Sequence, residues 1–180
     1  MENGVRELLC CGMESIMDAV RIEVRKYLST IKIDIKSPKI LVKTLVPGIE
    51  IPEYQSDGAA GFDIKSIVSI TLLPGETKVI DTGLFFAIPQ GYEMQIRPRS
   101  GLAANHQLTV LNSPGTIDSD YRGELKVILT NLGSSAFSVN AGDRIAQGVI
   151  SAVVQCDFMK VENLPPTERG SGGFGSTGIK

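Results

Sequence analysis

Two aspartates, Asp118 and Asp120, lie two residues apart within a polar segment that runs from Leu111 to Val127. In an extended chain, residues at this spacing point to the same face, so the two carboxylates would crowd one surface and repel each other. A repulsion of this kind needs a reason, such as activation of water or binding of a metal ion or a phosphate group. The alternative interpretation is a solvated turn, because Asp, Ser, Pro and Gly all favour turns on local grounds.

Groups that bind anions occur in a second segment, Arg97-Pro98-Arg99-Ser100-Gly101, at the start of a predicted short helix. Exposed backbone N–H groups at a helix start favour anions, and an arginine adds a forked donor that suits phosphate. The alternative is an ordinary helix start with a surface arginine. In isolation, the segment does not decide between these two interpretations.

Two further polar segments are punctuated by glycine. The segment 59–64 places Asp63 between apolar residues, and by itself it indicates a carboxylate satisfied within a β-turn. The segment 142–147 begins Gly-Asp-Arg and is expected to start a strand. There, Asp143 and Arg144 are expected to form a structural ion pair and to take no part in catalysis.

The C-terminal segment 165–180 is rich in glycine and serine, and a composition of this kind is flexible by default. It carries Arg169 and Phe174 among its glycines. Disorder alone would explain the segment. A basic and an aromatic side chain in a mobile tail would also suit a lid that clamps phosphate and stacks on a base.

The elements that must position these residues are predicted to be β-strands. Tyr92, Met94 and Ile96 alternate with polar residues, which indicates a strand with one buried face. Turn signals such as Pro-Gly separate further apolar runs, and many short strands of this kind favour a sandwich or a barrel. A short helix is predicted at 100–106. Strands are expected at 40–46, 77–88, 92–97, 124–130 and 144–154.

Residues 1–37 differ from the rest of the chain. From Val5 to Leu28, apolar side chains recur at intervals of three and four residues, as on one stripe of an amphipathic helix, and Asn3 fits its N-cap. We expect this stripe to pack in a core or an interface. The chain is therefore expected to comprise an N-terminal helical extension, 1–37, a β domain, 38–164, and a flexible Gly-rich lid, 165–180.

The composition argues against several classes of function. A net charge of −2 without a basic run gives no sign of a nucleic-acid-binding surface, and no apolar run is long enough to span a bilayer. Acidic side chains interrupt the first apolar residues, unlike a signal peptide. Three cysteines, an odd count, argue against a disulfide framework, and a single histidine argues against a structural zinc site. We expect a cytoplasmic enzyme or binding protein.

Taken in order, the five polar segments resemble the motifs of the trimeric dUTPase (dUTP diphosphatase) family, and the similarity runs from about Lys39 to Gly178. The resemblance implies an all-β fold, a distorted β-barrel of jelly-roll-like form, that assembles as a homotrimer with shared active sites. It implies Mg²⁺-dependent hydrolysis of dUTP to dUMP and diphosphate. Such a reaction keeps uracil out of DNA and supplies dUMP for dTMP synthesis.

The resemblance also assigns roles to residues. It implies that Asp118, rather than Asp120, is the general base that orients and deprotonates the attacking water. The segment 108–117, interpreted as a hairpin, would read uracil, and Tyr121 would stack against the deoxyribose and exclude a 2′-hydroxyl. The other implied nucleoside contacts are Asn112, Thr116, Ile117 and Lys126.

The resemblance places the phosphates and the metal between subunits. The residues implied to hold the triphosphate from a neighbouring subunit are Arg99, Ser100, Gly101 and Gln147. Phosphates and waters would hold most of the Mg²⁺ coordination sphere, and Asp63 would reach the ion through water. The third subunit would supply the tail, with Arg169 on the phosphates and Phe174 over the uracil.

Three residues depart from the family pattern. Phe62 stands where tyrosine is frequent, Gln107 where glycine is common, and Gly148 where a larger apolar residue is usual. Two other functions stay open, a dCTP deaminase of the same superfamily and a non-catalytic dUTP-binding or signalling protein. Ammonia release from dCTP would indicate the first, and absence of diphosphate release from dUTP would indicate the second. The unbroken set of motifs argues against both.

Overall fold

The computed structural model describes residues 37–173. The predicted N-terminal helix and Phe174 lie outside these residues. The chain divides into two units between Lys39 and Ile40, and every element described here belongs to the second unit. Within residues 37–173, no helix has the length and the apolar character that crossing a membrane requires.

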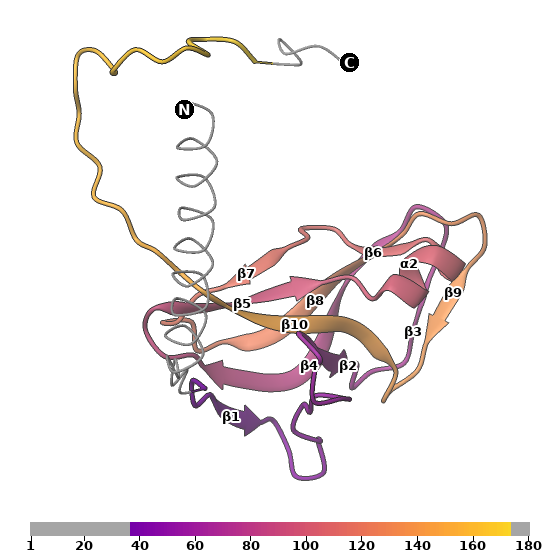
Figure 1. Cartoon of the computed structure of the whole chain (residues 1–180). Coiled ribbons are helices and arrows are strands. Elements are labelled where there is room, and N and C mark those ends of the chain that lie inside the picture. Colours follow the sequence, from indigo (N-terminus) through magenta and orange to yellow (C-terminus); the bar gives the residue numbers. More distant parts are fainter. Residues whose placement is uncertain (1–36, 174–180) are drawn as a thin grey trace, which may run out of the picture. The chain divides into compact units, whose positions relative to one another are not determined.

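Strands dominate the described part of the chain, and a short helix interrupts them between β5 and β6 (Figure 1). The described part of the chain is therefore mostly β, in agreement with the predicted fold class. In chain order the elements are β1 (Leu41–Thr44), β2 (Phe62–Lys65), β3 (Ile70–Leu72), β4 (Thr77–Ala87), β5 (Tyr92–Arg97), α2 (Ser100–His106), β6 (Leu108–Val110), β7 (Gly115–Ile117), β8 (Glu124–Asn131), β9 (Phe137–Val139) and β10 (Arg144–Ala152).

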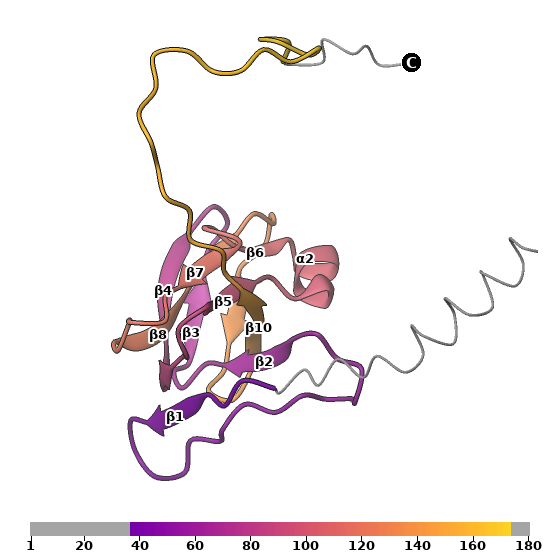
Figure 2. The same cartoon turned by 60° about the vertical axis from the view of Figure 1, so that its left-hand side comes forward.

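The strands form two four-stranded sheets and one strand pair, and their pairing is antiparallel. One sheet has the order β1-β4-β8-β6, the other has the order β2-β10-β5-β7, and β3 pairs with β9. Both four-stranded sheets contribute to one hydrophobic core, with Ile64 and Met94 from one sheet and Ile80 and Val127 from the other. Figure 2 shows β4 and β8 on one side of this core and β5 and β10 on the other.

The side chains of β5 follow the alternation seen in the sequence. Met94 and Ile96 are buried, whereas Glu93 and Gln95 lie on the outer face of the sheet. Helix α2 has the predicted bounds, and β1, β4, β8 and β10 differ from the predicted ranges only at their ends. The alternation predicts β5 well because that strand buries one face, and apolar runs between turn signals predict the other four strands.

The prediction of a hairpin at 108–117 is wrong in its pairing. Strand β6 pairs with β8 in one sheet, whereas β7 pairs with β5 in the other. The turn between them therefore connects the two sheets. Turn residues fix only the local path of the chain, and more distant strands decide which sheet each arm joins.

Gln107, which departs from the family pattern, ends α2 in the left-handed conformation, with φ at 54°. Its backbone N–H donates to the carbonyl of Ala103. A residue with a Cβ is strained at positive φ, whereas glycine adopts this conformation freely. The conformation at this position therefore explains why glycine suits it.

The other two departures, Phe62 and Gly148, compensate for each other. Gly148 in β10 is the cross-strand partner of Phe62 in β2, and a Cβ built on Gly148 would lie 2.6 Å from the Phe62 ring. The ring is buried in the core beside Phe86. The absence of a side chain at one position therefore makes room for the ring at the other.

We expect Gly148→Ala to lower the free energy of unfolding by roughly 1–3 kcal/mol, the usual cost of overpacking a core. The added methyl group would meet ring carbons of Phe62 that buried neighbours hold in place. Denaturant unfolding measures the effect. Gly58→Ala is the matched control, because nothing lies within 4 Å of a Cβ added there. Its stability should stay unchanged or rise by up to about 1 kcal/mol, and equal stabilities for the two variants would contradict the prediction.

Candidate active site

Three charged side chains from separate parts of the chain meet on the outer face of the β2-β10-β5-β7 sheet. Asp63 lies in β2, Arg144 begins β10, and Arg99 directly precedes α2. Asp63 Oδ1 lies 2.9 Å from Arg99 Nε, and Asp63 Oδ2 accepts a hydrogen bond of 3.0 Å from Arg144 Nη1. Only 15% of the Asp63 side chain is exposed, and a carboxylate buried to this extent needs charged partners. The two guanidinium groups supply them.

Asp63 therefore lies in a strand, and the prediction of a β-turn around it is wrong.

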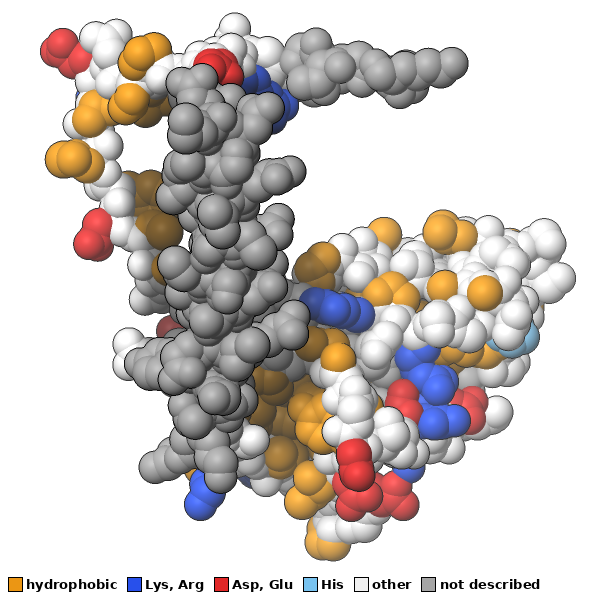
Figure 3. All heavy atoms as spheres, viewed as in Figure 1, with side chains coloured by type: hydrophobic (Ala, Val, Ile, Leu, Met, Phe, Trp, Pro, Cys, Tyr) orange, Lys and Arg blue, Asp and Glu red, His pale blue; other side chains and the backbone are white. Residues whose placement is uncertain are grey.

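Figure 3 shows blue and red side chains gathered on the part of this face that carries β10 and α2. A carboxylate between two arginines is a charge-assisted arrangement that also leaves guanidinium N–H groups for a further anion. The site can therefore hold an anionic ligand.

The register of β10 brings the polar segments together. Gln147 of β10 lies opposite Asp63 on one side and opposite Arg97 on the other. Gln147 Nε2 donates to the carbonyl of Pro98 at 2.8 Å, which ties the turn before α2 to the sheet. Segments 59–64, 97–101 and 142–147, which lie far apart in the sequence, thus form one cluster.

The predicted ion pair between Asp143 and Arg144 is wrong. Asp143 Oδ2 accepts hydrogen bonds from the backbone N–H and the Nδ2 of Asn140, at 2.7 and 3.4 Å, and so closes a turn. Arg144 reaches Asp63 instead. Sequence reasoning assigned no role to Arg144 at the site, because its partner lies on another strand.

Ser100 and Gly101 are exposed at the start of α2, and no side chain caps this end of the helix. The first N–H groups of a helix have no intrahelical partner, so they stay available to a ligand beside the Ser100 hydroxyl. Ser100 also lines a pocket of about 470 Å³, together with Gln147, Ser113 and Pro114. The predicted phosphate segment and the turn before β7 thus share one pocket within a single chain.

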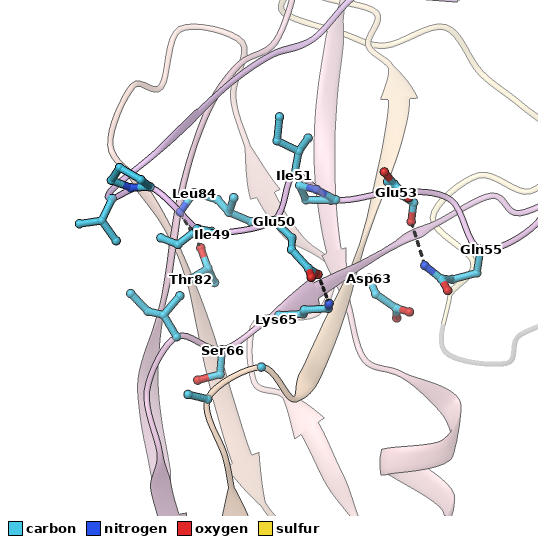
Figure 4. Close-up of a pocket in the computed structure, with 17 residues that line it drawn as sticks. Ile49, Glu50, Ile51, Glu53, Gln55, Asp63, Lys65, Ser66, Thr82 and Leu84 are labelled. Carbon is cyan, nitrogen blue, oxygen red and sulfur yellow. Dashed lines mark hydrogen bonds and ion pairs between the residues drawn. The ribbon is translucent and has the colours of Figure 1, made fainter.

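A larger cavity of about 1070 Å³ lies between β2 and the preceding loop. Figure 4 shows Asp63 and Lys65 on β2 beside the loop that carries Glu50 and Glu53. Lys65 forms an ion pair with Glu50, and the hydrogen bond from Lys65 lowers the pKa of the Glu50 carboxyl. Asp63 thus borders this cavity as well as the arginine cluster.

Asp118 follows β7 in a turn, where its backbone carbonyl accepts a hydrogen bond of 3.2 Å from the N–H of Tyr121. Asp118 and Asp120 therefore do not share the face of a regular strand. Both side chains are exposed, and within residues 37–173 no hydrogen bond or ion pair engages either carboxylate. The Asp118 carboxylate is thus accessible to water and to a ligand.

Two of the side chains predicted to contact the nucleoside, Tyr121 and Asn112, each lie against a glycine. Tyr121 lies against Gly123, where an added Cβ would come within 2.2 Å of the phenol oxygen, and its hydroxyl donates to the carbonyl of Glu124 at 3.1 Å. Asn112 lies against Gly115, where an added Cβ would come within 2.9 Å of its Nδ2. Both side chains therefore depend on a neighbouring residue without a Cβ.

Thr116 and Ile117 belong to β7, opposite Gln95 and Met94 of β5. Lys126 lies on the outer face of the other sheet, in ion pairs with Asp81 at 2.6 Å and Glu124 at 3.4 Å. The hydrogen bond to Asp81 raises the pKa of the Lys126 ammonium. Its charge is thus engaged with neighbouring strands.

Arg169 is exposed, and its Nε donates to the carbonyl of Gly172 at 2.8 Å, within a local turn.

Within a single chain, the predicted site residues Asp63, Arg99 and Gln147 lie together in one cluster. The structure leaves Asp118, Tyr121, Lys126 and Arg169 unbonded to this cluster in the described part of the chain.

The donor set limits how a metal ion could be held. Residues 37–173 contain no group of three or more His, Cys, Asp or Glu side chains placed to bind one. Asp63 offers a single carboxylate, already paired with two arginines. Both Asp63 oxygens are engaged, so Asp63 would contribute to a Mg²⁺ site only through water, and the other ligands would come from outside the protein.

An all-β chain that combines anion-binding donors at an arginine–carboxylate cluster with an accessible aspartate has the features of an enzyme that hydrolyses a phosphate-bearing substrate. Comparisons with known proteins identify the family. The family model for dUTPase matches residues 48–178, which include four of the five polar segments in full and the C-terminal one as far as Gly178. The chain therefore belongs to the dUTPase family.

Curated relatives and solved structures agree with this assignment. The deoxyuridine 5′-triphosphate nucleotidohydrolase of Nautilia profundicola is 58% identical over 140 residues, covering 78% of this chain and 99% of that protein. The protein of the same name from Wolinella succinogenes is 56% identical over 145 residues, covering 81% and 97%. The dUTPase of Staphylococcus bacteriophage 80alpha, solved with dUpNHpp, has a TM-score of 0.73 and 28% identity, and the match covers 79% of this chain and 100% of that chain.

Proposed function

We propose that the protein hydrolyses dUTP to dUMP and diphosphate. The membership of the dUTPase family, over the segments that build the arginine–carboxylate cluster, is the observation that supports this most strongly. Relatives named for this hydrolysis are 56% and 58% identical to the chain. By removing dUTP and supplying dUMP, the reaction would keep uracil out of DNA and provide the precursor of dTMP.

In the proposed mechanism, the triphosphate binds to the cluster beside α2. Arg99 donates guanidinium N–H groups to phosphate oxygens, and Ser100 and Gly101 add the hydroxyl and backbone donors of the helix start. Gln147, held on Pro98, completes this set. Donors that are in place before the reaction stabilise the charge that develops on the leaving diphosphate.

The segment around β7 is proposed to bind and recognise the base and the sugar. Backbone groups of Thr116 and Ile117, with Asn112 beside them, are proposed to hydrogen-bond uracil, so that a wrong base would leave buried polar groups unpaired. Tyr121 covers the deoxyribose face, and a 2′-hydroxyl would collide with its ring. Lys126 is proposed to complete the nucleoside pocket, with its ammonium oriented by Asp81.

Asp118 is proposed as the general base. Its free carboxylate orients a water molecule and takes a proton as the water oxygen bonds to the α-phosphorus. The bond from the α-phosphorus to the bridging oxygen breaks, and diphosphate leaves. Mg²⁺, bound with the substrate, would neutralise charge on the phosphates, and Asp63 would orient a water of its coordination shell. A dUTPase of phage phi11, 25% identical with a TM-score of 0.66 and covering 71% of this chain and 99% of that chain, was described with a structural Mg(II) ion.

The proposed active protein is a homotrimer in which three subunits share each site. The chain beyond β10 supports sharing, because Val154, Phe158 and Leu164 are 86%, 98% and 82% exposed. No hydrogen bond joins residues 154–166 to other described residues. Apolar side chains in this state are stabilised by packing on another copy of the chain. The tail would then bring Arg169 to the phosphates, and Phe174 to the uracil, of a neighbouring site.

The organisation into an extension, 1–37, a β domain, 38–164, and a lid, 165–180, belongs to the same proposal. The proposed location is the cytoplasm, where a reducing environment suits the exposed free thiol of Cys156. Neither nucleic acid nor a membrane is a proposed partner.

The test of the proposed function is diphosphate release from dUTP, dTTP, dCTP and UTP, each with Mg²⁺. We expect rapid release from dUTP alone. Comparable release from dTTP or UTP would contradict the proposed base and sugar selectivity. Ammonia release from dCTP would indicate a deaminase, and binding of dUTP without diphosphate release would indicate a non-catalytic protein.

A further inference from the structure

Arg144 owes its place beside Asp63 to an irregularity in β10. The register between β10 and β2 shifts between Arg144 and Ala146. Ile145 and Ala146, which are consecutive, are both buried in the core. In a regular strand, alternation from Gln147 would turn Arg144 toward the core. The bulge instead places Arg144 on the outer face with Gln147 and Asp63.

Arg144 makes two contacts within the cluster. The side chain of Arg144 donates from Nη1 to Asp63 Oδ2 at 3.0 Å, and its backbone carbonyl accepts from Nη1 of Arg99 at 3.0 Å. Arg99 Nε meets the other Asp63 oxygen at 2.9 Å. Asp63 and Arg99 are thus each held from two directions, and one residue supplies a contact to both.

This arrangement orients the phosphate-binding donors of Arg99. Its Nε and one N–H of Nη1 are engaged, and no described residue accepts a hydrogen bond from Nη2. A guanidinium whose other side is fixed presents its remaining N–H groups in one direction. Without Arg144, Asp63 Oδ2 would lose its partner, and the carboxylate could turn both oxygens toward Arg99 and occupy the donors meant for phosphate.

We propose that Arg144 is a positioning residue for triphosphate binding, which it supports by holding Asp63 so that the free N–H groups of Arg99 face the phosphates. This inference rests on the proposed function. Asp63, only 15% exposed, would keep Arg99 as a partner without Arg144, and 47% of the Arg144 side chain is exposed, so we expect its loss to lower stability only modestly. Bulges next to functional sites commonly redirect a side chain in this way.

The test uses Arg144→Ala, Arg144→Gln and Arg144→Lys in the full-length protein. We expect the first two to raise KM for dUTP roughly 10- to 100-fold, the effect of a lost hydrogen bond to a charged group, with a much smaller change in kcat. The Kd for dUpNHpp measured without Mg²⁺ should rise by a similar factor, and Arg144→Lys should recover part of the loss. Lys78→Gln is the matched control. Lys78 lies in β4 of the other sheet, and its replacement removes one cation and the ion pair with Glu76, so it should change none of these values.

Thermal unfolding of the four variants separates positioning from folding. We expect the Arg144 variants to melt close to the control. The inference is overturned if Arg144→Ala and Arg144→Gln leave KM and Kd within about twofold of the wild-type values, or if they lower kcat alone. If Arg144→Ala does not fold, Arg144→Gln and Arg144→Lys decide the outcome. Wild-type protein that binds dUpNHpp without hydrolysing dUTP would contradict the proposed function, while the Kd series would still test Arg144.

Discussion

Replacing Asp118 with asparagine is expected to lower kcat for dUTP hydrolysis by roughly 10²- to 10⁴-fold, the usual contribution of a general base. The amide keeps the size of the side chain but cannot take a proton from water. The fold should be unaffected, because the backbone carbonyl of Asp118, and not its side chain, accepts the hydrogen bond that closes the local turn. Steady-state diphosphate release and a thermal melt measure the two properties.

Asp120→Asn is the matched control for this prediction. Asp120 lies two residues further along the same turn, is also exposed, and carries the same charge. Its replacement should leave kcat within a few-fold of the wild-type value. Near-normal turnover in Asp118→Asn would remove Asp118 from the role of base, and a comparable loss in Asp120→Asn would show that net charge at the turn, rather than one carboxylate, matters.

Deletion of residues 169–180 is expected to lower kcat/KM for dUTP by about 10²- to 10³-fold, comparable to the loss of a key electrostatic donor. The deletion removes Arg169 and Phe174, the proposed phosphate clamp and base cover, so the bound substrate stays open to water. Stability should not change, because the described contacts of Arg169 are confined to the turn with Gly172. Kinetics and denaturant unfolding of the truncated protein check both statements.

Mixed assemblies test whether the tail serves a neighbouring subunit. Asp118→Asn protein and truncated protein, each nearly inactive alone, should regain a measurable fraction of wild-type turnover after they are unfolded and refolded together. A recovered site would combine the Asp118 of a truncated subunit with the tail of an Asp118→Asn subunit. Absence of recovery, with mixed trimers demonstrated by mass, would mean that each chain supplies its own tail.

The sequence alone determined the elements that depend on local chemistry. Alternation of apolar and polar residues located β5, because this strand buries one face. Turn signals on either side bounded β4 and β8 closely. Helix α2 was predicted with its observed bounds. Five short segments rich in glycine, proline and charged residues carry the resemblance to the dUTPase family.

The tertiary structure decided what depends on pairing between distant strands. β2, β3 and β9 have three or four residues each, too few to show a periodicity, and their partners stabilise them as strands. The arms β6 and β7 joined different sheets, although the turn between them predicted a hairpin.

Arg144 illustrates the same limit at the site. Its neighbour Asp143 was the predicted partner, yet a bulge in β10 turned Arg144 toward Asp63, 81 positions away in the sequence. Local sequence fixes turns and faces, because these depend on backbone conformation and burial nearby. The register of a sheet depends on the packing of the whole core, and in this protein that register placed the charges of the phosphate-binding cluster.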